Sequence, residues 1–280
     1  MSGRPDERRV AAMFVAPALT TIALIAIFPL AWTFWESLHR HDLRMPWLGR
    51  PFVGIANYVE IAGDDRFHSA LGHTAFFTAV TVTLELLLGL FLALAMNRVF
   101  RGRGALRVAI LLPWAIPTVV AGLLWRFLFQ SRGGSIWFID AWLAWVPVIV
   151  ADVWKTVPFV ALLLLAGLQS IPRELYEAAS MDGAGPARQL VSITLPHLRP
   201  ALLVALIFRT LDAFRVFDLI YVLTGGGPGT ATEPIALLTF NALFQNLRSG
   251  YASALSVVVF LITFSMALLL IRILEVKESR

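Results

Sequence analysis

The sequence predicts an all-α, polytopic membrane protein, a helical bundle with about six transmembrane helices. Hydrophobic residues make up 58% of its 280 residues, whereas a soluble domain has about 45–50%. The excess gathers in long runs, each sufficient to cross about 30 Å of hydrocarbon as a helix. These runs do not alternate between apolar and polar residues, so they lack the pattern of membrane β-strands.

Six spans follow one another along the chain, beginning with a retained N-terminal helix. They cover residues 11–35, 71–96, 105–130, 145–169, 199–223 and 251–274. The first run is too long for the apolar region of a signal peptide, and no small-residue cleavage pattern follows it. Residues 1–280 are expected to form one transmembrane domain, with a loop at residues 171–198 between spans four and five.

Basic residues are unequally shared between the two sides of the predicted membrane. With the N-terminus inside, thirteen lie in cytoplasmic segments and six on the opposite side. The thirteen are Arg4, Arg8, Arg9, Arg98, Arg101, Arg103, Arg107, Arg173, Arg188, Arg199, Arg272, Lys277 and Arg280. Cytoplasmic segments carry the excess of Lys and Arg in membrane proteins, so both termini are predicted to be cytoplasmic.

Several classes of protein are disfavoured by composition. The net charge of +5 comes from short segments between spans rather than from one basic stripe, so no nucleic-acid partner is expected. The chain has no cysteine, which excludes thiolate metal sites. It also has no G-x-x-x-x-G-K-[ST] phosphate loop, so this chain is not expected to be an enzyme or to bind a cofactor itself.

The loop between spans four and five predicts two short helices separated by a break. Glu174 and Glu177 suit the positive end of a first helix. Gly183 can adopt the left-handed conformation that ends a helix, and Gly185-Pro186 reinforces the break. Pro196 is expected to stop the second helix before span five begins.

This loop resembles the EAA loop of permease subunits in binding-protein-dependent ABC importers. The matching positions are Glu177-Ala178-Ala179, Gly183, Ile193 and Leu195-Pro196. The resemblance implies a type I ABC importer permease fold and a coupling helix that sits in a cleft of a separate ATPase. The residues implied in this contact are Glu177, Ala178, Ala179, Met181, Asp182 and Gly183. The alternative is a plain helical hairpin.

The chain is further similar to the maltose-type sugar permeases, a family that includes glycerol-phosphate permeases. The similarity lies in the run from Phe217 to Thr224, the following Gly225-Gly226-Gly227-Pro228, the segment 52–58, and the stretch from Leu111-Leu112-Pro113 through Pro117. One departure is His73, where the family usually has Asn. The resemblance implies that the loop of Gly225, Gly226, Gly227 and Pro228, predicted to be small and flexible, contacts a sugar-binding protein; a plain tight turn is the alternative.

Span five also carries four charged residues at intervals of three. Arg209, Asp212, Arg215 and Asp218 lie close enough on a helix to pair side to side. Charges in a membrane face a bundle interior or water, so this face is either an ion-pair ladder, part of a wet pathway, or both.

The resemblance places substrate-pathway positions on spans three, four and five. These positions are Thr118, Phe159, Arg209, Asp212, Ala213 and Val216. Phe159 would stack on a sugar ring, whereas Ala213 and Val216 lack the amides usual in the family, so substrate identity does not transfer.

Further polar residues within or near the spans have no family role. Asp152 and Lys155 are predicted to form a structural pair, and Glu85 and Arg126 to pair with each other or with a partner subunit. His39 and His41 flank Asp42; simple solvation is favoured there over a metal site.

Together these features predict a permease subunit of an ATP-driven importer in the cytoplasmic (inner) membrane of a prokaryote. Its expected substrate is a di- or oligosaccharide such as an α-glucoside. Its expected partners are a second homologous permease, two ATPase subunits that bind ATP and Mg, an extracytoplasmic sugar-binding protein and lipid. The alternatives are a glycerol-phosphate permease, an ion-coupled secondary transporter, a gated channel and an intramembrane enzyme.

Overall fold

The computed structural model describes residues 5–98, 101–133 and 136–278. Arg4 and Arg280, which entered the charge comparison, lie outside these residues. Within the described chain the structure is helical, and one isolated antiparallel bridge joins His39 to Phe52. Five described helices are long and apolar enough to cross a membrane, and a bent helix pair makes a sixth crossing possible. The predicted all-α class with about six spans is therefore confirmed.

The chain divides into two compact units. Unit 1 comprises Met1–Asp65 and Thr239–Leu261, and unit 2 comprises Arg66–Leu238 and Ile262–Arg280. Unit 1 holds α1 (Pro5–Ile22), the π-helical turn η1 (Ala23–Ile27), α2 (Phe28–Ser37), the 3-10 turn η2 (Pro46–Leu48), α3 (Ala56–Ala62), the π-helical turn η4 (Asn241–Gln245) and the first part of α14 (Ser249–Glu278).

Within unit 1, the segment between α2 and α3 is fixed to the start of α14. The Leu43 N–H donates to the Leu247 carbonyl at 2.9 Å, and the Gly250 N–H donates to the His41 carbonyl at 3.1 Å. A Cβ at Gly250 would lie 2.1 Å from the His39 carbonyl oxygen, so the backbones approach too closely for any other residue.

The two histidines of this segment are not simply solvated, so that prediction is wrong. His39 is buried, and its Nδ1 lies 2.7 Å from the Trp35 carbonyl oxygen. His41 pairs with the buried Glu36. Among the described residues, no group of three acidic or histidine side chains is arranged to hold a metal.

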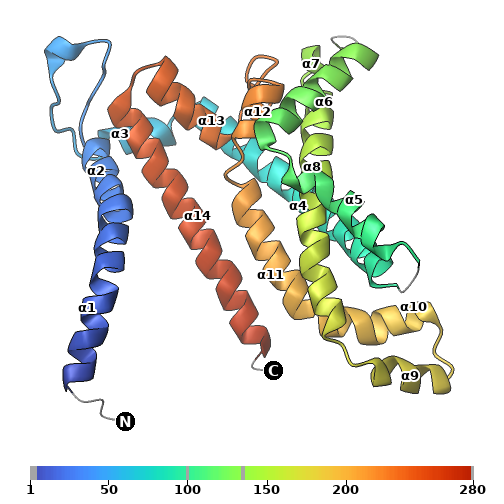
Figure 1. Ribbon diagram of the computed structural model, residues 1–280. Coiled ribbons are helices and arrows are strands. Elements are labelled where there is room, and N and C mark those ends of the chain that lie inside the picture. The colour runs from blue at the N-terminus through green and yellow to red at the C-terminus, as the bar shows by residue number, and fades with distance from the viewer. Residues whose placement is uncertain (1–4, 99–100, 134–135, 279–280) are drawn as a thin grey trace. The chain divides into compact units, whose positions relative to one another are not determined.

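Unit 2 is organised around α8, which contacts α5, α6, α11 and α12 (Figure 1). Its elements are α4 (Asp65–Asn97), α5 (Arg103–Ala115), α6 (Thr118–Gly133), α7 (Ile136–Ile139), α8 (Trp145–Gln169), α9 (Arg173–Met181), α10 (Pro186–Gln189), the π-helical turn η3 (Leu190–Thr194), α11 (Leu195–Ala213), α12 (Asp218–Leu223) and α13 (Ile235–Phe240). Buried apolar residues of α4, α8 and α11, including Met96, Leu164 and Leu198, form one core cluster.

The third span is broken, contrary to the prediction of one helix over residues 105–130. Helices α5 and α6 meet at 94°. Ile116 between them is extended, with ψ of 131°, because a residue that precedes a proline, here Pro117, disfavours the helical region. The break leaves the Ile116 carbonyl without a helical partner, and Lys155 donates to it from Nζ at 2.9 Å. The predicted pair of Lys155 with Asp152 is therefore wrong.

The fifth span begins earlier and ends earlier than predicted. One hydrophobic helical segment runs from Pro186 to Ala213, and Pro196 lies inside it rather than ending a helix. The π-helical turn η3 precedes α11, so Pro196 stands in the first turn of α11, where a missing N–H costs little. At the other end, the helix stops at Ala213, and residues up to 223 belong to a turn and to α12.

Gly89 allows α4 and α8 to approach closely, and its replacement is expected to destabilise unit 2. A Cβ there would lie 2.5 Å from Val160 Cγ1 and 3.3 Å from the Ala161 nitrogen. Gly89→Ala should therefore cost about 1–3 kcal/mol through overpacking and lower the thermal midpoint of the purified protein. Adding Val160→Ala should recover part of this loss. Gly72→Ala, in open space on the same helix, is the control; a loss there as large as at Gly89 would contradict the packing argument.

Candidate functional site

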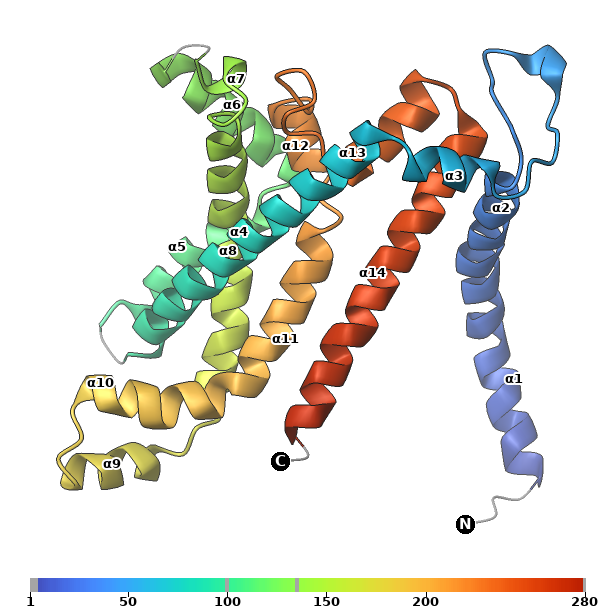
Figure 2. The same cartoon turned by 180° about the vertical axis from the view of Figure 1, so that it is seen from behind.

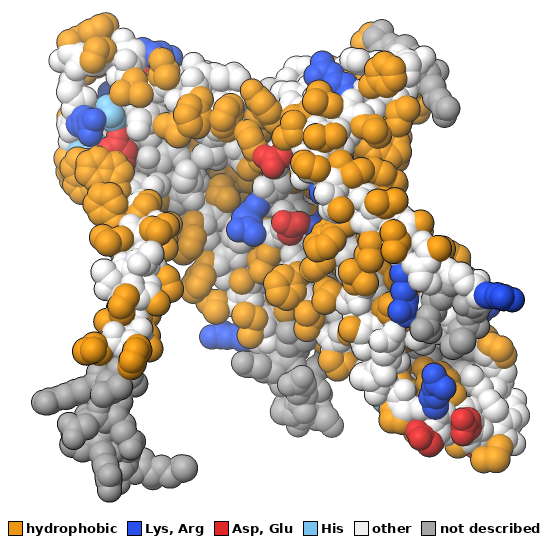
Figure 3. Space-filling view, in the orientation of Figure 1, with side chains coloured by type: hydrophobic (Ala, Val, Ile, Leu, Met, Phe, Trp, Pro, Cys, Tyr) orange, Lys and Arg blue, Asp and Glu red, His pale blue; other side chains and the backbone are white. Residues whose placement is uncertain are grey.

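The six predicted pathway residues line one cavity of unit 2. The cavity has a volume of about 570 Å³ and lies where α8, α11 and α12 meet the break between α5 and α6; we call it the α8–α11 cavity. Besides Thr118, Phe159, Arg209, Asp212, Ala213 and Val216, its walls include Trp114, Asp152, Lys155, Thr156, Arg215 and Asp218. Figure 3 shows acidic and basic side chains among hydrophobic ones near the junction of α11 and α12.

One wall of the cavity is aromatic. Phe159 of α8 stacks on Trp114 of α5, with ring centroids 5.9 Å apart and planes 24° from parallel. Both rings line the cavity, so they offer a flat apolar surface beside the polar groups. The early end of α11 at Ala213 lets the chain turn, and Val216 therefore also lines this space.

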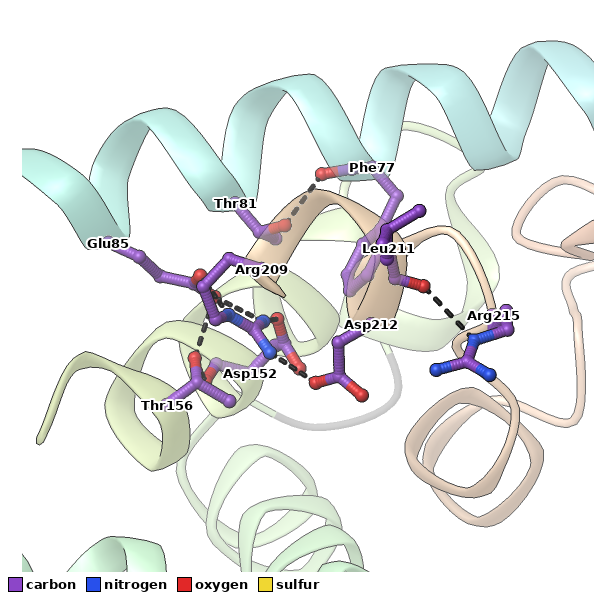
Figure 4. A network of polar contacts seen from close by, with 9 residues as sticks. All are labelled: Phe77, Thr81, Glu85, Asp152, Thr156, Arg209, Leu211, Asp212 and Arg215. Carbon is purple, nitrogen blue, oxygen red and sulfur yellow. Dashed lines mark hydrogen bonds and ion pairs between the residues drawn. The ribbon is translucent and has the colours of Figure 1, made fainter. Parts of the chain in front are cut away.

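The polar wall is centred on Arg209, whose guanidinium is bound by three carboxylates (Figure 4). Its Nε donates to Glu85 Oε2 at 2.6 Å, and its Nη2 donates to Glu85 Oε1 at 2.8 Å. Nη2 also donates to Asp152 at 3.3 Å, and Nη1 pairs with Asp212. Glu85 has no exposed surface and Arg209 is 3% exposed, whereas the Asp212 side chain is 68% exposed. The network joins α4, α8 and α11.

The predicted ladder along span five is therefore only half present. Arg209 and Asp212 pair as predicted, but Arg215 donates from Nε to the Leu211 carbonyl at 3.1 Å and forms no ion pair within the described chain. Asp218 lies in the first turn of a different helix, α12. The helix end at Ala213 separates the two halves of the pattern.

Two residues of the site, Glu85 and Asp152, were not assigned to it by sequence reasoning. Each stood out as a carboxylate within a span, which is a signal of function in a membrane, but their common partner, Arg209, was not predicted for either of them. Arg126, the other unassigned charge, donates to the Val222 carbonyl at 3.0 Å rather than to Glu85.

The loop at residues 171–198 forms the two predicted helices and the predicted glycine break. Gly183 has φ of +74°, and the Ala184 N–H donates to the Ala179 carbonyl at 2.8 Å, as in a left-handed helix cap. Figure 2 shows α9 and α10 side by side at the end of α8 and α11. Gln189 Nε2 links them by donating to Ser180 Oγ at 2.9 Å and to the Ala184 carbonyl at 3.0 Å.

The predicted contact residues of this loop are mostly open to solvent. Five are exposed, namely Glu177, Ala178, Met181, Asp182 and Gly183, and Ala179 is half-buried. Met181 is 85% exposed. These side chains therefore lie at the surface of the loop and not in the core of unit 2.

The glycine loop after α12 is more tightly held than the predicted flexible loop. Thr232 Oγ1 donates to the Gly227 carbonyl at 2.8 Å and lies 2.8 Å from Thr224 Oγ1. Gly226 is buried, and a Cβ there would lie 2.9 Å from Leu237 Cδ2. Gly225 remains exposed, and Gly227 and Pro228 are half-buried. The loop thus presents a fixed shape at its tip.

Position 73, where the sequence departs from the family pattern, lies next to this loop. His73 Nδ1 lies 3.2 Å from the Glu233 carbonyl oxygen. The adjacent Thr74 is fully buried and accepts a hydrogen bond from the Ile235 N–H at 2.9 Å. The residue that differs from the family pattern therefore lies where α4 contacts the segment that follows the glycine loop. His73 does not line the α8–α11 cavity.

A bundle of membrane helices with a polar cavity and an exposed helical loop defines a membrane transport subunit. The chain belongs to the family of binding-protein-dependent transport system inner membrane components, whose model matches residues 85–277. It is thus a permease subunit of an ABC importer, a non-enzymatic inner-membrane component, as the sequence predicted.

Named relatives cover almost all of the chain. The trehalose/maltose transport system permease protein MalF of Thermococcus litoralis is 43% identical over 95% of this chain and 94% of its own length. The trehalose transport system permease protein SugA of Mycobacterium tuberculosis is 42% identical over 92% and 86%. The sn-glycerol-3-phosphate transport system permease protein UgpA of Agrobacterium fabrum is 33% identical over 94% of each chain.

Solved structures share the fold. A chain of a bacterial ABC transporter involved in alginate import matches with a TM-score of 0.81 over 96% of both chains, at 20% identity. A chain of the methionine ABC transporter MetNI matches with a TM-score of 0.59 over 74% of this chain and 94% of that chain, at 18% identity. The importer-permease fold predicted from the sequence is confirmed.

Proposed function

We propose that the chain forms part of the translocation pathway for a neutral sugar, a di- or oligosaccharide such as an α-glucoside. The α8–α11 cavity carries this proposal, because an aromatic pair and a group of hydrogen-bonding charges line it together. Aromatic faces pack on the apolar faces of sugar rings, and carboxylates and guanidinium groups bond hydroxyls strongly. Its volume of about 570 Å³ is within the usual range for small-molecule sites. The names of the trehalose and maltose relatives support the same class of substrate.

The proposal includes the assembly in which the chain works. A second, homologous permease would complete the pathway, and two ATPase subunits would bind ATP and Mg and receive the loop of Glu177 to Gly183. An extracytoplasmic sugar-binding protein would contact Gly225, Gly226, Gly227 and Pro228. Both termini would then lie in the cytoplasm, which agrees with the excess of basic residues on that side.

The substrate class is tested by the ATPase activity of the complete complex in liposomes. The complex, with its binding protein, is exposed in turn to neutral disaccharides, oligosaccharides and sn-glycerol 3-phosphate. We expect one or more α-glucosides to stimulate ATP hydrolysis and the phosphate compound to have no effect. Stimulation by glycerol phosphate with none by any sugar would overturn the proposal. Solute uptake that continued without ATP would contradict an ATP-driven mechanism.

A further inference from the structure

Glu85 is a buried carboxylate that holds the cavity's arginine without lining the cavity itself. It has no exposed surface. Both of its oxygens accept hydrogen bonds from Arg209, at 2.6 and 2.8 Å, and Thr156 Oγ1 donates a further one at 2.6 Å. A bidentate pair of this kind fixes the plane of the guanidinium as well as its position.

This pairing decides which part of Arg209 faces the cavity. Glu85 takes up the edge formed by Nε and Nη2, and Asp152 accepts a further bond from Nη2. Nη1 remains, and it is shared with the exposed Asp212. A solute therefore meets Arg209 as an oriented hydrogen-bond donor whose charge is already neutralised, and not as a free cation.

By formal charge, the residues around the cavity carry one more negative than positive group once Glu85 is included. The lining cations are Lys155, Arg209 and Arg215, and the lining carboxylates are Asp152, Asp212 and Asp218. Glu85, directly behind Arg209, adds a fourth carboxylate. In a membrane interior such charges are weakly screened, so the excess acts on any charged solute that enters.

We propose that Glu85 is a positioning residue that also sets the charge selectivity of the α8–α11 cavity. It orients Arg209 toward sugar hydroxyls, and its negative charge makes the cavity reject anionic solutes such as phosphorylated sugars. This inference rests on the proposed function, because it takes the cavity to be the sugar site. A site for phosphate would instead leave the paired edge of the guanidinium open to the ligand.

The test measures binding of a neutral and an anionic form of one sugar. The purified complex of permeases and ATPases, without binding protein, is dialysed against labelled trehalose or trehalose 6-phosphate. Wild type should bind trehalose and exclude the phosphate. Glu85→Gln keeps the side-chain shape and removes one negative charge, so trehalose affinity should fall and phosphate affinity should rise by about tenfold or more. Asp152→Asn should also raise phosphate affinity, and it leaves the Glu85–Arg209 pair in place.

Glu233→Gln is the matched control. Glu233 is equally buried, at 2% exposed, and also forms a bidentate pair, with Arg66 at 2.7 and 2.8 Å, but it does not line the cavity. Neither affinity should change in this variant. If wild type binds trehalose but neither cavity variant gains phosphate binding, or the control gains as much, the role of Glu85 is refuted and the proposed function stands. If wild type binds neither compound, the role of Glu85 is refuted as well; if it prefers the phosphate, the proposed function itself fails.

Discussion

Asp212→Ala is expected to reduce sugar uptake by about a hundredfold while the importer complex remains assembled. The Asp212 side chain is 68% exposed and faces the α8–α11 cavity, so its loss removes a ligand for sugar hydroxyls. Hydrogen bonds to charged groups contribute about 1.5–3 kcal/mol each, which is up to about a hundredfold in rate or affinity. Assembly should survive, because Arg209 keeps its bonds to Glu85 and Asp152 and no buried charge is left unpaired.

This expectation is checked by uptake of labelled sugar into proteoliposomes, with assembly measured by size-exclusion chromatography. Asp212→Asn, which keeps one acceptor, should lose less activity than Asp212→Ala. Glu60→Ala removes a half-exposed carboxylate that pairs with Arg248 in unit 1, and it should transport normally. Wild-type uptake by Asp212→Ala would show that sugar does not pass this side chain.

The second large effect is expected in the loop at residues 171–198. Replacing Glu177 and Gly183 together by arginine should prevent attachment of the ATPase subunits and abolish uptake. Glu177 is exposed, so its reversal changes the docking surface and leaves the core of unit 2 intact. Gly183 has a left-handed backbone in open space, so an arginine there adds bulk at the surface as well as about 1–2 kcal/mol of strain.

Gly102→Arg is the control that separates the effect of backbone strain from the effect of a changed docking surface. Gly102 also has a left-handed backbone, with φ of +98° and no atom within 4 Å of the place a Cβ would take, but it lies between α4 and α5. Co-purification of the ATPase with each variant gives the readout, and the Gly102 variant should retain it. Retention by the Glu177 and Gly183 variant as well would place ATPase docking elsewhere on the chain.

Local sequence signals predicted those parts of the fold that depend on neighbouring residues. Hydrophobic runs located span four at residues 145–169, as the structure has it, because a span must be long and apolar whatever its partners. The glycine break at Gly183 was also readable, since its cause lies in the backbone of that residue. The break at Pro117 and the continued helix at Pro196 were not readable, because they depend on which groups donate hydrogen bonds to the freed carbonyls and on the π-helical turn before α11.

For the cavity too, features set by local sequence could be predicted, whereas contacts between distant residues could not. Its six pathway residues came from a family pattern and do line one space, but their roles in transport stay a prediction. Pairings between residues far apart in the chain were beyond sequence reasoning. Arg209 lies 124 positions from Glu85 and 57 from Asp152, and no periodicity relates residues on three different helices.

The helical segment from Pro186 to Ala213 connects the loop at residues 171–198 to the Arg209 network. The segment changes direction between α10 and α11 (Figures 1 and 2), with the loop of Glu177 to Gly183 at one end and the Arg209 network near the other. Helix α11 has 19 residues and is about 28 Å long at 1.5 Å per residue, so a tilt of about ten degrees at its start would displace its far end by about 5 Å. Under the proposed function, an ATPase that moved the loop of Glu177 to Gly183 would therefore also move the Arg209 network, because α11 connects the two.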